Sequence, residues 1–480
     1  MTKNNNHADK IRVFLIGAIL LCFFFAPVAK SATVLDQVGL INRNRLSVQS
    51  ESPLYIGMST ISGMDSLNRF YTQREFKPVW MNNSGLLPIA EELIRLLDSA
   101  FLEGLKPSDY HLNEIRKLIP AVTEKKLPEN QFDPTVLADL ELLLSDAFLD
   151  LGSHLLSGRI NPELIEPEWM TIRRHTDLVK ILNQAVLTKQ IAETLDFLRP
   201  SQVEYFRLKE ALQTYRTIAL EGGWGTTPAL KKGRRSKYVI KLRHRLYQTG
   251  DLVKNRQKDN GDTLFDKALA SAVSRFQLRH GLRVNGRVDE ATRHALNIPV
   301  EERITQLIVN LERWRWLPRD LGNPHIQVNI PNFELRLIEG SNTVLKSRVI
   351  VGSSARRTPI FSNMMTFLIL NPFWYIPNII ASDDMLHLVK KDPGYLARKH
   401  IRLYNSWEEN TVELDPLTID WQNMTQDSFQ YLFIQDPGTY NALGAVKFMF
   451  PNTLNIYLHD TPNKKLFKKS SRDLSSGCVR

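Results

Sequence analysis

One histidine and one cysteine near the end of the chain are the residues whose types and spacing suggest chemistry. His459 lies within the sequence NIYLHD, and Cys478 lies 19 residues later within SSGCVR. In NIYLHD, Ile456 and Leu458 alternate with Tyr457 and His459, which predicts a strand that buries the first pair and presents the second pair together. A histidine on a strand and a cysteine on a small, glycine-containing turn can meet in space. The spacing therefore predicts a nucleophile and its base.

The start of the chain has the layout of an export signal. Basic residues precede an apolar run at 13–26, and small residues follow it. We therefore predict a signal peptide at 1–32, with an uncleaved membrane anchor as the alternative. If the signal is removed, Cys478 is the only cysteine of the mature chain, because Cys22 lies in the apolar run. A lone thiol in an oxidising compartment is a buried bystander, an intermolecular link or a reactive centre.

Composition limits the class of protein. A chain of 480 residues exceeds what one hydrophobic core serves, so we expect several domains. The net charge of +11 suggests acidic partners, among which nucleic acid, anionic lipid and acidic cell-wall polymers all qualify. A basic linker is predicted at 226–237, and its run KKGRR has no interleaved aromatic residues, so we expect no nucleic-acid binding. The sequence shows neither clustered metal ligands nor phosphate-binding glycines, so we expect no metal site and no cofactor.

Periodicity predicts a multidomain α+β chain. Residues 33–225 show helical spacing of apolar residues, which predicts an all-α scaffold. A compact unit with three short helical faces follows at 238–298, and a helical connector at 299–322. After the connector the pattern changes to alternation, which predicts a β-rich domain at 323–480. An insert at about 378–440 departs from the strand pattern, and it is either a cover over a site or a decorative subdomain.

The unit at 238–298 contains the sequences AVSRFQ, GL, NG and AT between residues 272 and 292. These pieces resemble the small three-helix peptidoglycan-binding domain of cell-wall enzymes. Gly281 and Gly286 suit the tight turns that such a unit requires. The resemblance implies glycan strands of peptidoglycan as a partner.

Six short motifs occur along the second half of the chain. They are RVIVG at 348–352, RTP at 357–359, NP at 371–372, PGY at 393–395, YLHDTPN at 457–463 and SSGCVR at 475–480. Together they resemble the catalytic domain of L,D-transpeptidases (YkuD type), in the large periplasmic form with a helical scaffold and a capping subdomain. The resemblance implies a periplasmic enzyme of peptidoglycan biosynthesis, cell wall organisation and cell shape, with anchoring in the inner membrane as an alternative.

The resemblance also implies the chemistry. Cys478 is the expected nucleophile that attacks a tetrapeptide stem before its terminal D-Ala, and His459 is the expected proton donor and acceptor. The amine of a neighbouring stem then completes a 3→3 cross-link. Carbapenem-type inhibitors are expected to acylate Cys478.

Residues close to these motifs have expected roles in binding. The backbone N–H groups around Ser476, Gly477 and Cys478, those of Ser476 and Gly477 above all, are candidates for an oxyanion hole, because glycine lets the backbone turn its donors inward. Tyr457 and Trp374 are expected either to line the substrate cleft or to pack in the core, and Arg480 to hold a substrate carboxylate. The lysine-rich loop at 464–472, which lies before the cysteine, either favours the thiolate through its positive potential or is a solvated surface.

Two other readings remain at the level of the sequence. Water in place of the acceptor amine would make the same site an L,D-carboxypeptidase. Catalytic domains of this family continue past the cysteine motif, whereas this chain stops at Arg480, so we expect the C-terminal part of the catalytic fold to be missing. An inactive, truncated cell-wall-binding protein is the corresponding alternative.

Overall fold

The computed structural model describes residues 33–47, 53–123, 132–165, 169, 171, 173–253, 262–406 and 411–480. The signal peptide predicted at 1–32 lies outside these residues. The chain forms two compact units, of which unit 1 holds the described residues up to 101 with 106–153 and 177–198, and unit 2 holds 102–105, 154–176 and 199–480. Among the described helices, none combines the length and the hydropathy that a bilayer crossing needs.

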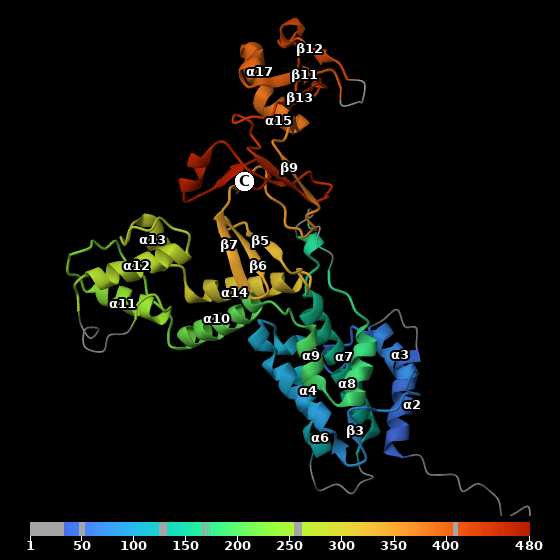
Figure 1. Cartoon of the computed structure of the whole chain (residues 1–480). Helices are drawn as coiled ribbons and strands as arrows, with labels where there is room; N and C mark the ends of the chain where they lie inside the picture. Colours follow the sequence, from blue (N-terminus) through green and yellow to red (C-terminus); the bar gives the residue numbers. More distant parts are fainter. Residues whose placement is uncertain are drawn as a thin grey trace, which may run out of the picture. The chain divides into compact units, whose positions relative to one another are not determined.

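Unit 1 is built from helices, as the spacing of its apolar residues predicts (Figure 1). They are α2 (Val34–Ser47), α3 (Met64–Thr72), α4 (Pro88–Asp98), α5 (Leu112–Leu118), α6 (Pro120–Thr123), α8 (Leu178–Thr188) and α9 (Ile191–Leu198), together with most of α7 (Pro134–Ser157). The side chains of Leu140, Leu143 and Leu144 on α7 are completely buried. Since leucines on several sides of α7 are covered, this helix forms the core of unit 1.

Two short hairpins add to the helical scaffold. β1 (Tyr55–Ile56) pairs with β2 (Ser59–Thr60), and β3 (Met81–Asn82) pairs with β4 (Gly85–Leu86). The first turn contains Gly57 at φ +58°, a conformation that glycine adopts without a steric cost. Strands of two residues are too short to show alternation, so periodicity does not reveal them.

A buried carboxylate lies in the middle of α7. Glu141 is completely buried and accepts hydrogen bonds from the Val79 amide at 2.7 Å and the Tyr71 hydroxyl at 2.9 Å. Burial raises the pKa of Glu141 to about 7, because the charged form loses its hydration. Unit 1 therefore contains a group that binds a proton more readily in the folded chain than in the unfolded one.

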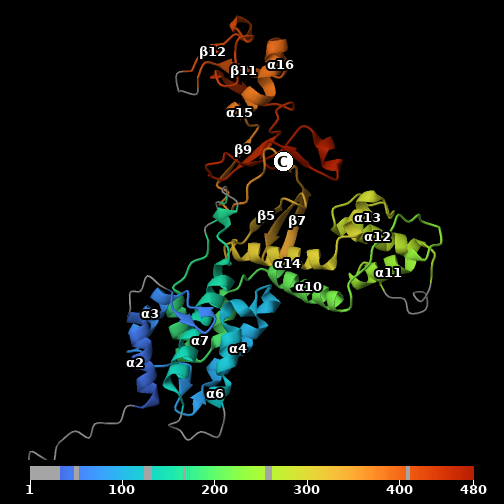
Figure 2. The same cartoon turned by 180° about the vertical axis from the view of Figure 1, so that it is seen from behind.

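Unit 2 contains a pair of long helices and a three-helix unit (Figure 2). α10 (Val203–Leu220) and α14 (Val300–Arg315) pack through a cluster that includes Tyr205, Leu212 and Leu311. Between them in sequence lie the predicted helices of the peptidoglycan-binding unit. They are α11 (Tyr238–Gln248), α12 (Lys267–Arg279) and α13 (Glu290–Leu296).

The segment 226–237 differs from the predicted linker. Leu230 is nearly buried in the core of the three-helix unit and forms a β-bridge with Val288. Arg235 forms a second bridge with Leu264. The sequence did not reveal this role, because an isolated β-bridge has no periodic pattern of residues. The segment is therefore part of the folded unit.

Outside the insert, the described residues of the β-rich domain form three small sheets. β5 (His325–Asn329), β6 (Glu334–Glu339) and β7 (Asn342–Arg348) form an antiparallel sheet; β9 (Phe367–Leu370), β14 (Val446–Met449) and β15 (Leu458–His459) form a second one; β8 (Val351–Gly352) pairs in parallel with β16 (Asp473–Ser475). The motif RVIVG predicts one strand, but only its last two residues form β8, and β7 ends at its first residue. Every residue of β7 is exposed, so alternation could not reveal that strand.

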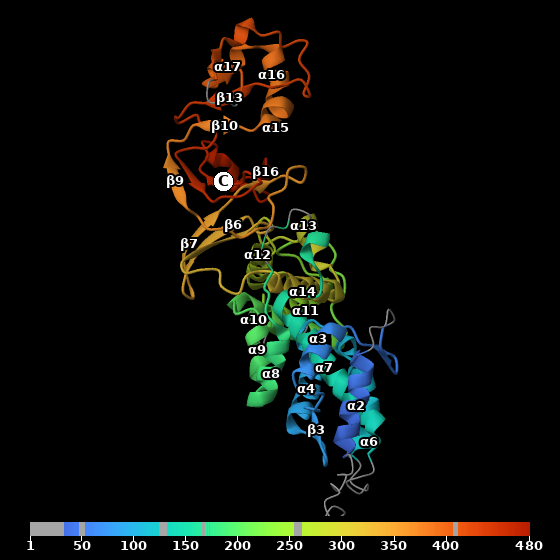
Figure 3. The ribbon, with the colours of Figure 1, turned by 90° about the vertical axis from the view of Figure 1, so that its right-hand side faces the viewer.

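The predicted insert folds with a core of its own (Figure 3). Its sheet has the order β10 (Trp374–Ile376), β13 (Leu432–Gln435), β11 (Ile401–Tyr404) and β12 (Glu413–Leu414). Its helical part comprises α15 (Asn378–Ile380), a π-helical turn (Ala381–Met385), α16 (Leu386–Lys391) and α17 (Gly394–Arg398). Val389, Leu403 and Phe433 are completely buried between these elements. Together with the helical scaffold and the β-rich C-terminal part, this confirms the predicted mixed α and β architecture.

Candidate active site

A tight turn carries Cys478. β16 ends at Ser475, and the chain then turns through Gly477, whose φ of +118° lies in the region that favours glycine. A Cβ atom on this residue would lie 3.2 Å from Ile456 Cδ1. Both the backbone conformation and the close neighbour therefore require glycine immediately before the cysteine.

Strand register brings Cys478 and His459 to the same face. Val479 donates its N–H to Tyr457 O at 3.2 Å, and the His459 N–H donates to Val479 O at 3.0 Å. Val479 is thus the parallel partner of Leu458. Since neighbouring residues point to opposite faces, Cys478 shares a face with Tyr457 and His459. The packing agrees for the other residues, because Val479 lies in one apolar cluster and Tyr457 and Cys478 in another, while Leu458 contacts both.

The imidazole of His459 has a defined tautomer. Its Nδ1 lies 2.6 Å from Asp460 O, and a carbonyl oxygen only accepts, so Nδ1 carries a proton. The backbone of Leu443 also interacts with the ring. Burial, followed by the charge of Arg480, lowers the pKa of His459 to about 4. The ring is therefore neutral near pH 7. The alternation was expected to present Tyr457 and His459, but both are less than one-tenth exposed because the strand is covered on both faces.

The thiol of Cys478 is half-buried. Burial raises its pKa, while the Tyr457 amide and the charges of Lys447 and Arg480 act in the opposite direction. Within the described residues, no hydrogen bond joins the thiol to the imidazole, and Sγ lies 3.8 Å from Asn455 O. The resting pair is thus a neutral thiol and a neutral imidazole.

Lys447 is a neighbour of this site that the sequence analysis missed. It lies on β14 as the antiparallel partner of His459, and its ammonium lies 3.9 Å from the centroid of the Tyr457 ring. Burial lowers the pKa of Lys447, and the nearby thiol acts against this. A cation inside an otherwise apolar strand, VKFM, is the signal that could have indicated it.

The side chains of the lysine-rich loop make other contacts than the expected one with the thiol. Lys464 pairs with the carboxylate of Asp460 at the surface. Arg472 is nearly buried and donates to the backbone carbonyls of Val349 and Phe333, both at 3.0 Å. These side chains hold the loop, and the cations that act on the thiol are Lys447 and Arg480.

Trp374 and Arg480 line the same cavity, of about 260 Å³. The backbone of Arg480 is fixed by two hydrogen bonds of 2.9 Å with Ile350, and its side chain reaches the cavity. Trp374 packs against both the core of the insert and the cluster that contains Tyr457. The other lining residues are Met385, Tyr395, Lys399, Ile401, Gln435, Tyr440, Ala442, Thr461, Pro462 and Asn463. The structure therefore places two predicted binding residues at a shared hollow.

The predicted oxyanion donors differ in availability. The Gly477 N–H donates to the Ser475 hydroxyl at 3.2 Å and so is already used. The Ser476 hydroxyl lies 3.4 Å from the Arg356 guanidinium. Within the part of the chain that the structure describes, the Cys478 N–H donates to no protein acceptor. Of the amides in this turn, those of Ser476 and Cys478 donate to no protein acceptor among the described residues, and that of Cys478 belongs to the same residue as the thiol.

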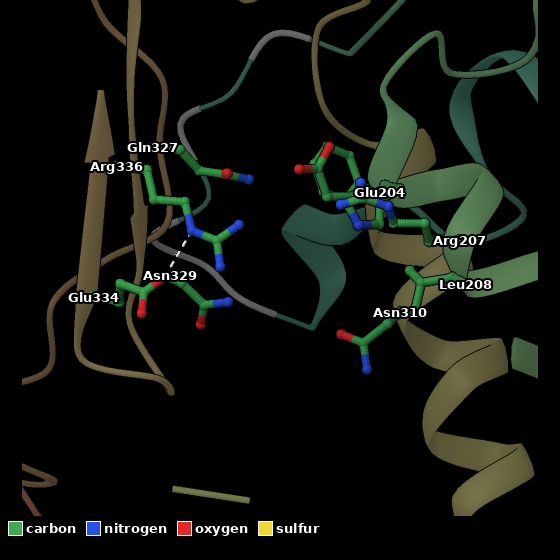
Figure 4. A pocket seen from close by; sticks show the side chains of 9 residues that line it. Glu204, Arg207, Leu208, Asn310, Gln327, Asn329, Glu334 and Arg336 are labelled. Atoms are coloured by element: carbon green, nitrogen blue, oxygen red, sulfur yellow. Dashed lines mark hydrogen bonds and ion pairs between the residues drawn. The ribbon is translucent and has the colours of Figure 1, made fainter. Parts of the chain in front are cut away.

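A larger cavity of about 360 Å³ lies elsewhere in unit 2 (Figure 4). Its walls come from α10, α14, β5 and β6, and include Glu204, Arg207 and Trp314. Glu334 on one wall pairs with Arg336 at 2.6 Å, and also with Lys346. The lining includes no predicted catalytic or binding residue and shares none with the cavity of about 260 Å³, so this cavity is separate from the candidate active site.

One cluster in unit 1 has the composition of a metal site. Ligand atoms of His111, Asp146 and Asp150 lie within 4.8 Å of one another. The Asp146 carboxylate, however, accepts hydrogen bonds from the amides of Ser62 and Gly63, and from His111 at 3.0 Å. These bonds satisfy the buried carboxylate where it faces the start of α3, so the cluster is explained by capping.

Comparisons with known proteins agree with this arrangement. Family models match at residues 65–212 ("Scaffold domain"), 235–296 ("Putative peptidoglycan binding domain") and 323–480 ("L,D-transpeptidase catalytic domain"). A Haemophilus influenzae protein named "Putative L,D-transpeptidase" is 40% identical over 181 residues, which are 38% of this chain and 36% of that protein. The chain thus matches just over a third of that relative's length. It carries an L,D-transpeptidase catalytic domain at its C-terminal end, preceded by a peptidoglycan-binding domain and a scaffold domain.

Proposed function

We propose that this chain is a cysteine L,D-transpeptidase that forms 3→3 cross-links in peptidoglycan. The observation that supports the proposal most is the parallel register of Val479 with Leu458, because it puts Cys478 on the face of His459. The match of residues 323–480 to the catalytic domain gives the reaction class. The match to a peptidoglycan-binding domain supports peptidoglycan as the substrate polymer.

In the proposed first step, Cys478 Sγ attacks the carbonyl that precedes the terminal D-Ala of a tetrapeptide stem. The thiol proton passes to Nε2 of His459, which is neutral and carries its other proton on Nδ1. Collapse of the tetrahedral intermediate returns this proton to the leaving amine. D-Ala departs, and a thioester remains on the enzyme.

In the second step, the amine of a neighbouring stem attacks the thioester, the C–S bond breaks, and the cross-link forms. His459 takes the amine proton and returns it to the departing sulfur of Cys478. Lys447 and Arg480 favour the thiolate through their charges. Arg480 and Trp374 line the cavity where the carboxylate and the side chain of a stem residue would bind. The domains are those of cell-wall enzymes, so the proposed location is the periplasm, and carbapenem-type inhibitors are the expected covalent ligands.

The test uses the full chain and intact-mass spectrometry. Incubation with a carbapenem should add one inhibitor mass to the wild type and none to the variant Cys478→Ser. Muropeptide analysis after incubation with tetrapeptide-rich peptidoglycan should then show 3→3 dimers. Free tripeptides without dimers would instead establish a carboxypeptidase. A folded protein that forms no adduct would overturn the catalytic proposal and favour a wall-binding role.

A further inference from the structure

Two hydroxyl groups hold the turn that carries the nucleophile. Thr358 Oγ1 donates to Gly477 O at 2.7 Å and accepts the Gly352 N–H at 2.8 Å. On the other side of the turn, Ser475 Oγ donates to Cys478 O at 2.6 Å and accepts the Gly477 N–H. Thr358 belongs to the motif RTP, which lies 119 residues away from Gly477 in the sequence. The turn is therefore fixed by a loop distant in the chain.

The contact with Thr358 sets the direction of the peptide between Gly477 and Cys478. In a trans peptide, the C=O and the N–H point to opposite sides. Since Thr358 holds Gly477 O on one side, the Cys478 N–H points to the other side. Within the described residues this N–H has no protein acceptor, and it belongs to the same residue as the attacking sulfur.

An amide in this position has a specific use in acyl transfer. When Sγ attacks a carbonyl carbon, a C–S bond forms, the carbonyl π electrons move to oxygen, and the thiol proton moves to His459. The resulting oxyanion lies one bond from the carbon that the sulfur has attacked. A preorganised N–H beside the sulfur stabilises that oxygen without any reorganisation at the moment of reaction.

We propose that Thr358 is a positioning residue that fixes the 477–478 peptide, so that the Cys478 N–H serves as an oxyanion donor. The inference rests on the proposed function, because only an acyl-transfer reaction forms an oxyanion here. A hydroxyl that bridges the Gly352 amide and Gly477 O is what this role needs. Serine can supply the same hydroxyl, whereas the isosteric valine cannot.

The experiment compares two reactions of the same thiol in the full-length wild type, Thr358→Val and Thr358→Ser. Intact-mass spectrometry follows the addition of a carbapenem to Cys478, which passes through an oxyanion. It also follows alkylation by iodoacetamide, which displaces iodide and forms none. Peptide mapping locates both adducts. Circular dichroism verifies the fold, and Thr358→Ala replaces the valine variant if that variant does not fold.

Thr358→Val should lower the rate of carbapenem addition about 100-fold, which is in the range for the loss of one oxyanion donor. The rate of alkylation should stay within about twofold of the wild-type rate, and its pH dependence should not change, because Thr358 does not act on the sulfur. Thr358→Ser should restore most of the carbapenem rate. Equal carbapenem rates in wild type and Thr358→Val, or a parallel fall of both reactions, would overturn the inference. Failure of the wild type to add carbapenem at all would overturn the proposed function itself.

Discussion

Two histidines in unit 2 have the same depressed pKa in different surroundings. Burial lowers the pKa of both His459 and His280 to about 4, in each case with help from a nearby arginine. In both rings Nδ1 lies close to a carbonyl oxygen, at 2.6 Å for His459 and 2.9 Å for His280. His280, however, stacks on Phe276 in the three-helix unit, whereas His459 shares a strand face with a cysteine.

The comparison shows that a lowered histidine pKa indicates burial and does not by itself indicate a catalytic role. Both rings lost hydration when the chain folded, and neither value distinguishes a base from a packed side chain. What distinguishes His459 is the set of neighbours that the strand register provides: a thiol on the adjacent segment and a cation, Lys447, on the other side.

The largest expected effect separates the two histidines directly. His459→Ala should lower the rate of carbapenem addition to Cys478 about 10³-fold, because general-base catalysis contributes about 10²–10⁴-fold. His280→Ala should leave that rate within about twofold of the wild type. Intact-mass kinetics measure both variants. Equal losses in both would show that burial, and not the neighbouring thiol, accounts for the effect.

The next effect compares a glycine from each domain. Gly477→Ala must place a Cβ at φ +118° and 3.2 Å from Ile456 Cδ1, so it should lower carbapenem addition about tenfold or more and reduce thermal stability. Gly281→Ala has φ +66° with nothing within 4 Å, so it should cost about 1–2 kcal/mol for the left-handed conformation alone. Its carbapenem rate should not change. Thermal unfolding together with adduct kinetics checks both, and an active Gly477→Ala would contradict the account of the turn.

A pH experiment extends the comparison to the other unit. The pKa of His459 is about 4 in the folded chain, against an ordinary value of 6.5. Between pH 4 and pH 6.5 the unfolded chain therefore binds more protons, and the stability of the region around His459 falls as the pH falls. Glu141 binds its proton at about 7 when folded, against 4.5, so its contribution to the stability of unit 1 rises as the pH falls through that window.

Peptide-resolved hydrogen exchange at pH 6.5 and 4.5, corrected for intrinsic rates, measures the two responses. Protection of α7 should increase relative to that of β14 and β15 at the lower pH. Glu141→Gln should remove the increase in α7, because it removes the titrating group. The same direction of change in both regions would contradict the assignment of these two groups.

The smallest effect concerns the cations around the thiol. Lys447→Met removes a positive charge that acts on Cys478, so the pKa of the thiol should rise, and iodoacetamide alkylation should require a higher pH. Lys464→Met is the matched control, since its ammonium pairs with Asp460 at the surface. It should leave the alkylation profile unchanged. A shift of equal size in both variants would mean that the lysine loop contributes after all.

Much of the architecture could be predicted because local periodicity carries it. The leucines of α7 and the apolar faces of α12 mark helices, and alternation marks β5 and β6. β7 was missed because all its residues are exposed, and the bridges of Leu230 and Arg235 were missed because single pairs have no period. Short pairings of this kind depend on partners distant in the chain.

By itself, the sequence determined which side chains are present for chemistry: a histidine beside alternating apolar residues, and a cysteine after a glycine that a tight turn requires. Only the tertiary structure decided how they meet. The parallel pairing of Val479 with Leu458 selects the shared face, β14 brings Lys447 beside it, and Thr358 fixes the peptide before Cys478. The physical reason is that register and hydrogen bonds between distant segments depend on the packing of the whole domain, which no local pattern of residues records.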